Sequence, residues 1–465
     1  MNEEELLGMM RSTPVSSLFF DHLLLPGGWA RDVRVTVSDG AIATIEADSR
    51  PAAQDQRHGC GLPGMPNLHS HAFQRGIAGL TEKPGAGEDN FWSWREHMYR
   101  FVDRMTPADM QAIAALAYME MLEGGFTRVG EFHYLHHDRD GGHYGDTAEM
   151  SAALVAAAEE SGIGLTLLPV LYRHSGFGAQ PPQDRQARFV TSLDDYARLI
   201  EGADRHVARL PDGIVGIAPH SLRAVSARDL DGLAPLMAGR PVHIHIAEQM
   251  KEVEDCIAWS GRRPVEWLLD HADVDNSWCL VHATHMSETE TMAMARSGAI
   301  AGLCPITEAN LGDGFFPARA FIAAGGRYGI GSDSNVSIDC AEELRLLEYG
   351  QRLVHRGRNI MAHETGWSTG AALYCAALDG GTAALGVGSG LSAGAPADIV
   401  SLDLDHPTLA CRSGDALIDS FLFAAGRSAV DCVWRRGEKL VSGGRHRARE
   451  RVTKRYRAAL ERLIP

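Results

Sequence analysis

Two histidines, His69 and His71, stand one residue apart in the segment MPNLHSHAFQRG, at the end of a short apolar run. Alternate residues of a β-strand point to the same side, so a strand here would direct both imidazoles toward one point. Paired imidazoles are suited to binding a transition-metal ion. An isolated H-x-H pair also occurs in ordinary polar packing, so the rest of the sequence must decide between the two interpretations.

Side chains of the same kinds fall at the ends of three later apolar runs. The first contains His243, His245 and Glu248 (PVHIHIAE), the second His282 and His285 (WCLVHATH), and the third Asp333 (GSDS). Three imidazoles and one carboxylate form a ligand set suited to Zn²⁺, although iron or manganese could also occupy it. A metal with one position open for water lowers the pKa of that water to about 7. The expected chemistry is hydrolytic attack on a carbon–heteroatom centre.

The elements that would position these residues alternate between apolar strand-like runs and amphipathic helix-like stretches. Such alternation predicts a parallel sheet covered by helices, and eight units of this kind predict a (β/α)8 TIM barrel, an α/β fold. Catalytic side chains gather at the C-terminal ends of barrel strands, which is where the histidines and Asp333 fall. The eight strand-like runs are 64–71, 127–135, 164–172, 213–222, 241–248, 278–285, 299–306 and 327–334.

The barrel is expected to span residues 64–385, with a small β-sandwich accessory domain formed from both termini. Residues 1–63 would supply its N-terminal part, because 31–48 alternate apolar and polar residues around a hairpin turn at Asp39-Gly40. Residues 386–465 would supply its C-terminal part and a terminal helix. That helix is predicted from the basic run Arg445–Arg462, which we interpret as a solvated helix rather than a binding patch.

Two segments near the first strand have local signals of their own. The run that begins at Thr106 predicts a helix, since Thr106 can cap it, Pro107 suits the first turn, and Gly124 and Gly125 can end it. The preceding residues, 80–99, predict a long loop that overhangs the barrel mouth and could act as a lid.

Composition narrows the class of protein. No stretch of about 18 apolar residues is present, so no membrane span is predicted, and the acidic start MNEEELLGMM does not resemble a signal peptide. The formal charge of −16 argues against nucleic-acid and anionic-membrane partners. The eight cysteines form no C-x-x-C pair and are expected as buried thiols. Together these features indicate a cytoplasmic enzyme.

The ordered motifs PGMPNLHSH, HIHIAE, LVHATH and GSDS resemble the amidohydrolase superfamily, in its deaminase branch that uses a single metal. The segment 386–403 also resembles the return of that superfamily into its sandwich domain. The resemblance implies one divalent metal ion, with zinc expected, and a homodimer is compatible with it. It implies that Glu248 shuttles protons, that His282 orients the water or the tetrahedral intermediate, and that the metal ligands are His69, His71, His245 and Asp333.

Elementary chemistry agrees with these implied roles. Glu248 follows His245 by three residues, so it could collect a proton from the attacking water and pass it to a departing amine. Asp333 could bind the metal while accepting a proton from the same water. Glu248 alone could instead be a carboxylate at a helix N-terminus, where the helix dipole stabilises it.

Finer phrases resemble the formimidoylglutamate deiminases of histidine degradation. These phrases are NLHSHAFQR, FWSWREHMYR, GEFHYLHH, APHSLRAV and CPITEANLGDG. The resemblance implies hydrolysis of N-formimidoyl-L-glutamate, a small dicarboxylate amidine, to N-formyl-L-glutamate and ammonia. It also implies substrate binding by Arg95, Tyr134, His220 and Arg223. Arginine suits this task because its guanidinium group binds a carboxylate through two parallel hydrogen bonds.

Three alternatives stay open at this point. A deaminase of guanine or a related base would share the metal residues but would line its pocket with amide and aromatic groups. A non-catalytic barrel could keep the metal only for structure or binding, although Glu248, His282 and Asp333 are all present. A binuclear hydrolase of cyclic amides would need a bridging lysine, which the fourth predicted strand lacks.

Overall fold

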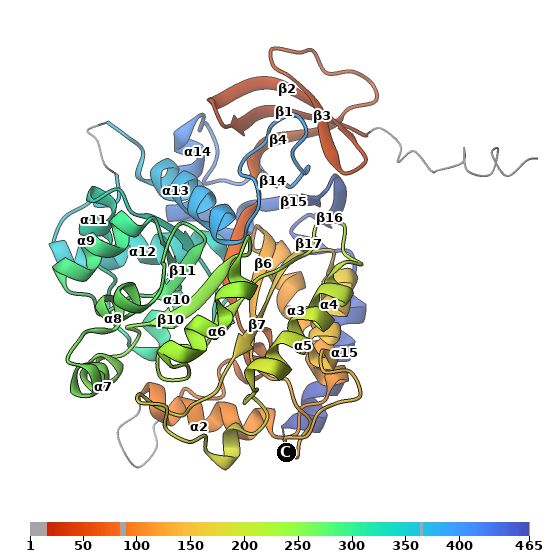
Figure 1. Ribbon diagram of the computed structural model, residues 1–465. Coiled ribbons are helices and arrows are strands. Elements are labelled where there is room, and N and C mark those ends of the chain that lie inside the picture. Colours follow the sequence, from red (N-terminus) through yellow and green to blue (C-terminus); the bar gives the residue numbers. More distant parts are fainter. Residues whose placement is uncertain (1–15, 84–89, 363–365, 465) are drawn as a thin grey trace, which may run out of the picture.

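The computed structural model describes residues 16–83, 90–362 and 366–464. Its central feature is a (β/α)8 barrel, which confirms the predicted fold (Figure 1). All eight predicted runs contain a barrel strand, and neighbouring strands pair in parallel. The strands are β5 Met65–Ser70, β6 Phe126–His133, β7 Gly164–Leu171, β8 Ile214–Val215 with β9 Ala218–Pro219, β10 Val242–Ile246, β11 Trp278–His282, β12 Ile300–Leu303 and β13 Arg327–Ile330.

Two short contacts close the strands into a ring. Parallel bridges join Ile217 to Val242, and Ser70 to Asp333, so the first barrel strand meets the last. The fourth predicted run is divided into the short pieces β8 and β9, both of which pair with β7. Strands β5, β6, β7 and β10 are buried along their whole lengths, as a sheet covered by helices requires.

Helices alternate with the strands and cover the barrel. The longest begins as predicted: Thr106 accepts a hydrogen bond from the backbone of Asp109, Pro107 is the first residue, and Gly124 follows the last. The helices that surround the barrel are α3 Pro107–Glu123, α4 Glu149–Ser161, α5 Leu193–Val207, α6 Ala227–Met237, α7 Met250–Ser260, α8 Pro264–His271, α9 Glu288–Ser297, α10 Pro305–Leu311, α11 Ala318–Ala323, α12 Cys340–His355, α13 Thr369–Ala384 and α14 Asp415–Ser420.

The two ends of the chain form one accessory β domain, as predicted. Its strands join in a single eight-stranded sheet, and β4 pairs antiparallel with β14 to unite the N-terminal and C-terminal parts. Asp39 and Gly40 both have positive φ, 53° and 82°, in the tight turn between β2 and β3. The strands are β1 Ser16–Leu25, β2 Gly28–Ser38, β3 Ala41–Glu46, β4 Gln56–Pro63, β14 Ile399–Leu402, β15 Val430–Arg435, β16 Glu438–Ser442 and β17 Arg445–His446.

Buried ion pairs tie the accessory domain to the barrel. Arg435 at the end of β15 and Arg128 on β6 both reach Asp212, each at 2.7 Å, and Arg435 also pairs with Asp398. Both arginine side chains are nearly inaccessible to solvent. Because a buried charge is costly unless it is paired, this network holds the two parts of the chain in one arrangement.

The helix α2, Phe91–Val102, corrects the expectation that residues 80–99 form one long loop. The side chain of Asn90 accepts hydrogen bonds from the backbone of Trp92 and Ser93, which starts the helix within the segment expected to be a loop. Residues 84–89 of that segment lie outside the described residues. Figure 1 shows α2 at the end of the barrel opposite the accessory sheet, where it borders the barrel mouth.

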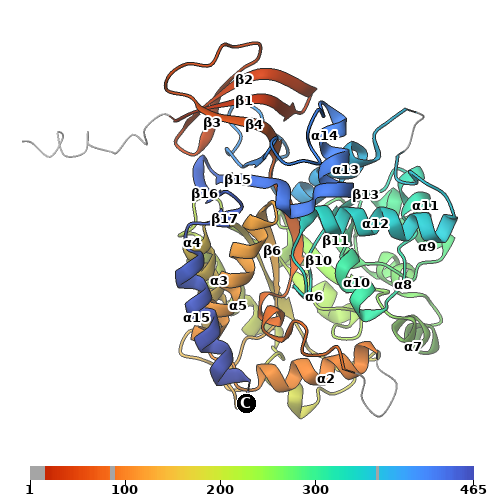
Figure 2. The same ribbon diagram turned by 180° about the vertical axis from the view of Figure 1, so that it is seen from behind.

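The terminal helix α15 spans Arg449–Leu463, so it begins later than the predicted Arg445. Residues 445 and 446 instead pair with β16 as the short strand β17. The helix packs along α3, as Figure 2 shows from behind. Its arginines form ion pairs with acidic groups of the barrel helices, including Arg449 with Glu123. The basic run is therefore a surface helix with exposed arginines, as expected, and its ion pairs hold it against the barrel helices.

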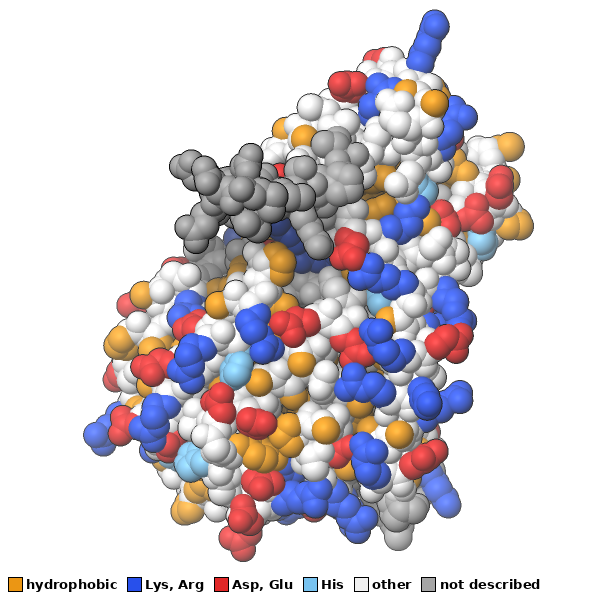
Figure 3. Space-filling model, turned by 90° about the vertical axis from the view of Figure 1, so that its right-hand side faces the viewer, with side chains coloured by type: hydrophobic (Ala, Val, Ile, Leu, Met, Phe, Trp, Pro, Cys, Tyr) orange, Lys and Arg blue, Asp and Glu red, His pale blue; other side chains and the backbone are white. Residues whose placement is uncertain are grey.

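Two further features concern the cysteines and the surface. All eight cysteines are free, and six are buried, but Cys375 and Cys411 are exposed, contrary to the expectation that all were buried. No helix in the described ranges is long and apolar enough to cross a membrane. Figure 3 shows acidic and basic side chains interspersed over one face, so neither sign of charge dominates there.

Candidate active site and metal centre

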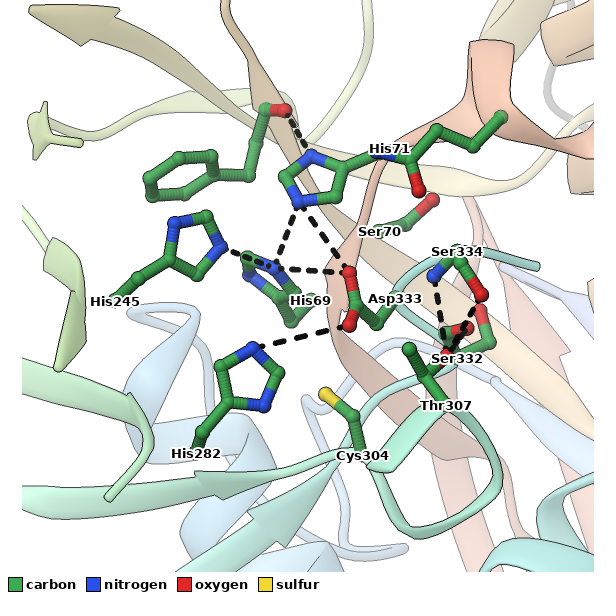
Figure 4. Close-up of polar contacts among 12 residues, drawn as sticks. His69, Ser70, His71, His245, His282, Cys304, Thr307, Ser332, Asp333 and Ser334 are labelled. Atoms are coloured by element: carbon green, nitrogen blue, oxygen red, sulfur yellow. Dashed lines mark hydrogen bonds and ion pairs between the residues drawn. The ribbon is translucent and has the colours of Figure 1, made fainter. Parts of the chain in front are cut away.

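Three histidines at the ends of β5 and β10 meet Asp333, which follows β13, at the centre of the barrel mouth (Figure 4); they are His69, His71 and His245. The Nε2 atom of His69 lies 3.3 Å from Nε2 of His71 and 3.0 Å from Nε2 of His245. The Oδ1 atom of Asp333 lies 3.6 Å from Nε2 of His69 and 3.3 Å from Nε2 of His71. The four side chains predicted as metal ligands therefore face one another across a few ångströms.

This donor set fits a divalent metal ion. His69, His71 and His245 form one of the clusters able to hold such an ion, and all three side chains are buried. Burial lowers the pKa of His69 to about 4 and that of His71 to about 3, so both imidazoles are neutral at pH 7. The Nδ1–H group of His71 donates to the carbonyl oxygen of Phe132 at 2.8 Å, which leaves the Nε2 lone pair facing the cluster.

Asp333 is ionised in this setting. Burial opposes ionisation, but the surrounding imidazoles of His69, His71 and His282 hold the pKa of Asp333 well below its usual range. A carboxylate and three neutral imidazoles make a ligand set of one oxygen and three nitrogens, which are donor types that zinc binds in proteins.

The backbone at the strand ends is held in an unusual conformation. His282 and Asp333 both have positive φ, 67° and 44°, as does Ala247 after β10 at 49°. Residues other than glycine rarely adopt this region, and such strain is concentrated at functional sites. Hydrogen bonds from the backbone of Asp333 to His69 and from His71 to Asp333, both 2.9 Å, hold the end of β13 against β5.

Glu248 and His282 stand beside the cluster. The Oε1 atom of Glu248 lies 3.8 Å from Nε2 of His282, which is itself 3.8 Å from Oδ2 of Asp333. Burial raises the pKa of Glu248 above its ordinary value, as is common for carboxyl groups that transfer protons in active sites. Burial alone lowers the pKa of His282, but the carboxylates of Glu248, Glu308 and Asp333 raise it to about 10.

A pocket opens above the cluster, and all four predicted substrate-binding residues line it. Arg95 comes from α2, Tyr134 follows β6, and His220 and Arg223 follow β9. The guanidinium groups of Arg95 and Arg223 lie 5.2 and 5.8 Å from the centre of the Trp92 ring, so the arginines converge from two elements. Arg223 also lies 3.7 Å from Glu248.

Two histidines of the predicted strands that were not assigned as metal ligands, His243 and His285, lie outside the ligand cluster, as expected. His243 lies two residues before His245 on β10, farther from the barrel mouth, and its Nε2–H group donates to the carbonyl oxygen of Ala384 at 2.8 Å. His285 is only partly buried, and its backbone N–H donates to the carbonyl oxygen of Ala247 at 3.0 Å.

Sequence reasoning missed three polar residues of this region. Gln74 lines the pocket and donates to the hydroxyl oxygen of Tyr134 at 3.0 Å. Glu252 accepts hydrogen bonds from the backbone of Ala247 and Glu248, and Glu308 contacts His282. Gln74 follows His71 by three residues, and that proximity was the one signal available for it. The two glutamates gave no signal by spacing, because their partners are set by tertiary packing.

Comparison with known proteins decides the family. Residues 61–440 match the model of the amidohydrolase family, a span that contains the whole barrel and every residue of the site. The chain belongs to the amidohydrolase family. Residues 18–59 of this amidohydrolase also match a second model, described as the N-terminal domain of formimidoylglutamate deiminase HutF.

Individual relatives of this amidohydrolase agree with both matches. It is 51% identical to the formimidoylglutamate deiminase of Pseudomonas aeruginosa, over 97% of this chain and all of the relative. It is 52% identical to an amidohydrolase from Brucella melitensis of known crystal structure, with a TM-score of 0.94 over 97% of this chain and all of that one. An adenosine deaminase from Xanthomonas campestris with bound zinc shares the fold, at 22% identity, a TM-score of 0.79, and coverage of 96% of this chain and 98% of that one.

Proposed function

We propose that this amidohydrolase is a formimidoylglutamate deiminase, which hydrolyses N-formimidoyl-L-glutamate to N-formyl-L-glutamate and ammonia in histidine degradation. The observation that carries the proposal is the convergence of Arg95 and Arg223 on one pocket beside the histidine cluster. The relative from Pseudomonas aeruginosa, whose name states this activity, supports it over nearly the full length of both chains.

The two arginines match the two carboxylates of the proposed substrate. Arg223 is largely buried; its Nε–H group makes no hydrogen bond to a described residue, and carboxylate oxygens of Glu248 and Glu252 lie 3.7 and 3.8 Å from the guanidinium. A buried guanidinium whose donors are not all used is suited to a substrate carboxylate, since Arg–carboxylate hydrogen bonds are strong and directional. Arg95 is partly exposed and faces the pocket from α2. Binding of one carboxylate by each arginine would hold the substrate between α2 and the end of β9.

We propose zinc as the metal, held by His69, His71, His245 and Asp333. When bound, such an ion supplies a Lewis acid that activates a water molecule at neutral pH. Neutral imidazoles and an ionised carboxylate are the protonation states that this role requires, and the pKa shifts of His69, His71 and Asp333 favour those states.

The remaining steps belong to Glu248, His282 and Asp333. Glu248 takes a proton from the attacking water and delivers it to the nitrogen that leaves as ammonia, because an amidine nitrogen departs only when protonated. His282 directs its Nε2 atom toward the carboxylates of Glu248 and Asp333, where it orients the water and stabilises the tetrahedral centre. Asp333 accepts the second proton of the water as the carbonyl of the product forms, and this proton also passes to the leaving nitrogen, so that both protons of the water depart with ammonia.

The alternatives are less well supported by the pocket. A guanine deaminase has no use for two arginines in its pocket, since guanine carries no carboxylate. A binuclear hydrolase would need a bridging lysine, whereas the residues that line this pocket include no lysine. A non-catalytic barrel would not need Glu248 and His282 to lie beside the ligand cluster, as they do here.

An ammonia-release assay of the purified protein tests the proposal. We expect rapid release from N-formimidoyl-L-glutamate, weak release from N-formimidoylglycine, which lacks the side-chain carboxylate, and none from guanine. Strong turnover of guanine, or equal turnover of the glycine compound, would contradict the dicarboxylate assignment.

A further inference from the structure

The carboxylate of Glu308 lies directly behind His282, on the side away from the ligand cluster. Its Oε1 atom is 3.3 Å from Nδ1 of His282, and the backbone N–H of Cys304 donates to the same oxygen at 2.9 Å. Both side chains are buried, Glu308 at 6% exposure and His282 at 1%. Glu308 is thus fixed by the backbone at the end of β12 and presents an oxygen to the imidazole.

The two nitrogens of His282 face different partners. Nδ1 faces Glu308, whereas Nε2 lies 3.8 Å from both Glu248 and Asp333. The ring of His282 stacks on that of His245, with centroids 5.6 Å apart and an interplanar angle of 16°. Stacking restricts the plane of the ring but is compatible with a 180° flip about the Cβ–Cγ bond, which exchanges Nδ1 with Cδ2 and Nε2 with Cε1. A partner at Nδ1 selects the orientation in which Nε2 faces Glu248 and Asp333.

We propose that Glu308 is a positioning residue for the reaction assigned above. It accepts a hydrogen bond from Nδ1–H of His282, and so fixes the ring orientation in which Nε2 faces the reacting atoms. A carboxylate that holds a histidine by one ring nitrogen leaves the other nitrogen available for chemistry. The proposal rests on the proposed deiminase function for its kinetic effect, but the hydrogen bond itself can be observed without substrate.

If Glu308 had a purely structural role, it would act by stabilising the start of α10. Glu308 lies in the first turn of that helix, where a carboxylate is favourable whatever it contacts. The structure offers a matched comparison in Glu343, a fully buried carboxylate on α12 that accepts a hydrogen bond from the backbone of Ile306 in the same turn at 2.9 Å. Glu343 supports the start of α10 as Glu308 does, but from the side of α12.

The experiment compares Glu308→Gln and Glu308→Ala with Glu343→Gln in the zinc-loaded enzyme. We expect kcat to fall about 10-fold or more in Glu308→Ala, with a smaller fall in Glu308→Gln, which keeps an acceptor without the charge. KM and zinc content should change little. Glu343→Gln should stay within about twofold of the parent in kcat. Equal losses of kcat in Glu308→Gln and Glu343→Gln would show that Glu308 only stabilises the start of α10, and would overturn the proposal.

Nuclear magnetic resonance of the substrate-free enzyme separates this proposal from the substrate assignment. With ¹⁵N-histidine labelling, His282 should show a downfield Nδ1–H proton signal, assigned by its absence in His282→Asn. That signal should move upfield in Glu308→Gln, disappear in Glu308→Ala and stay unchanged in Glu343→Gln. An unchanged signal in Glu308→Ala would overturn the proposal even if the enzyme acts on formimidoylglutamate. The expected changes of the signal would support the proposal even if the enzyme does not act on formimidoylglutamate.

Discussion

Nε2 of His245 lies 3.0 Å from Nε2 of His69, although 176 positions separate the two residues in the sequence. The contact exists because β5 and β10 end at the same mouth of a closed barrel. Two neutral imidazoles with lone pairs directed at one another form a poor contact by themselves and a good one around a cation. The contact between His245 and His69 is therefore the first feature through which the assigned metal site can be tested.

Replacing His245 by alanine should abolish both metal binding and activity. The variant loses one of the three buried nitrogen ligands and leaves a cavity in its place, so only two imidazoles and one carboxylate remain to bind the metal. His243→Gln is the matched control, since His243 lies on the same strand but bonds to the carbonyl oxygen of Ala384. Elemental analysis by mass spectrometry should find about one metal ion per chain in the parent and in the control. A full complement of metal in His245→Ala would argue against the assigned site.

Glu248→Gln should keep the metal and lose most of its activity. The amide matches the shape of the carboxyl group but cannot transfer a proton, and general acid–base catalysis contributes about 10²–10⁴-fold to a rate. The measurement is kcat with N-formimidoyl-L-glutamate beside metal content on the same sample. If the variant kept more than about a tenth of the parent kcat, proton transfer by Glu248 would be excluded as the main pathway.

Substitution of Arg95 tests the carboxylate contacts. Arg95→Gln should raise KM for N-formimidoyl-L-glutamate by about 10- to 100-fold, because hydrogen bonds between charged groups contribute about 1.5–3 kcal/mol. Arg185→Gln is the control, because Arg185 and Arg95 both lie over the ring of Tyr99, but Arg185 forms an exposed ion pair with Glu96. Similar KM values for the Arg95 and Arg185 variants would count against the contact.

The sequence predicted the site better than it predicted what surrounds it. The order of strands in a parallel barrel is the order of the chain, so polar residues at successive strand ends had to share one mouth. Residues 80–99 were interpreted as a loop because the glycines and proline of 84–87 obscured the Asn90 cap of α2. The contacts of Glu308 and Glu252 depend on how helices pack on the barrel, and no local pattern records that packing.

Glu131 makes the pH dependence of stability testable. Burial raises the pKa of this β6 carboxyl to about 8, far above its unfolded value of 4.5. The folded state therefore holds a proton that the unfolded state releases, so its stabilising contribution is full below pH 4.5 and is lost as the pH rises toward 8. Glu131→Gln removes this titration. Relative to the variant, the parent should lose free energy of unfolding between pH 5 and pH 8 in urea denaturation. If the free energies of unfolding of the parent and the variant changed equally with pH, or if the parent gained stability relative to the variant, the raised pKa of Glu131 would be contradicted.

The most direct test is anomalous X-ray scattering at the zinc absorption edge, measured on crystals of the active enzyme. We predict one strong peak within bonding distance of Nε2 of His69, His71 and His245 and of the carboxylate of Asp333. The pocket bordered by Arg95 and Arg223 should open directly onto it. Absence of anomalous signal at that position in active crystals, at the edges of zinc, iron and manganese alike, would contradict the account.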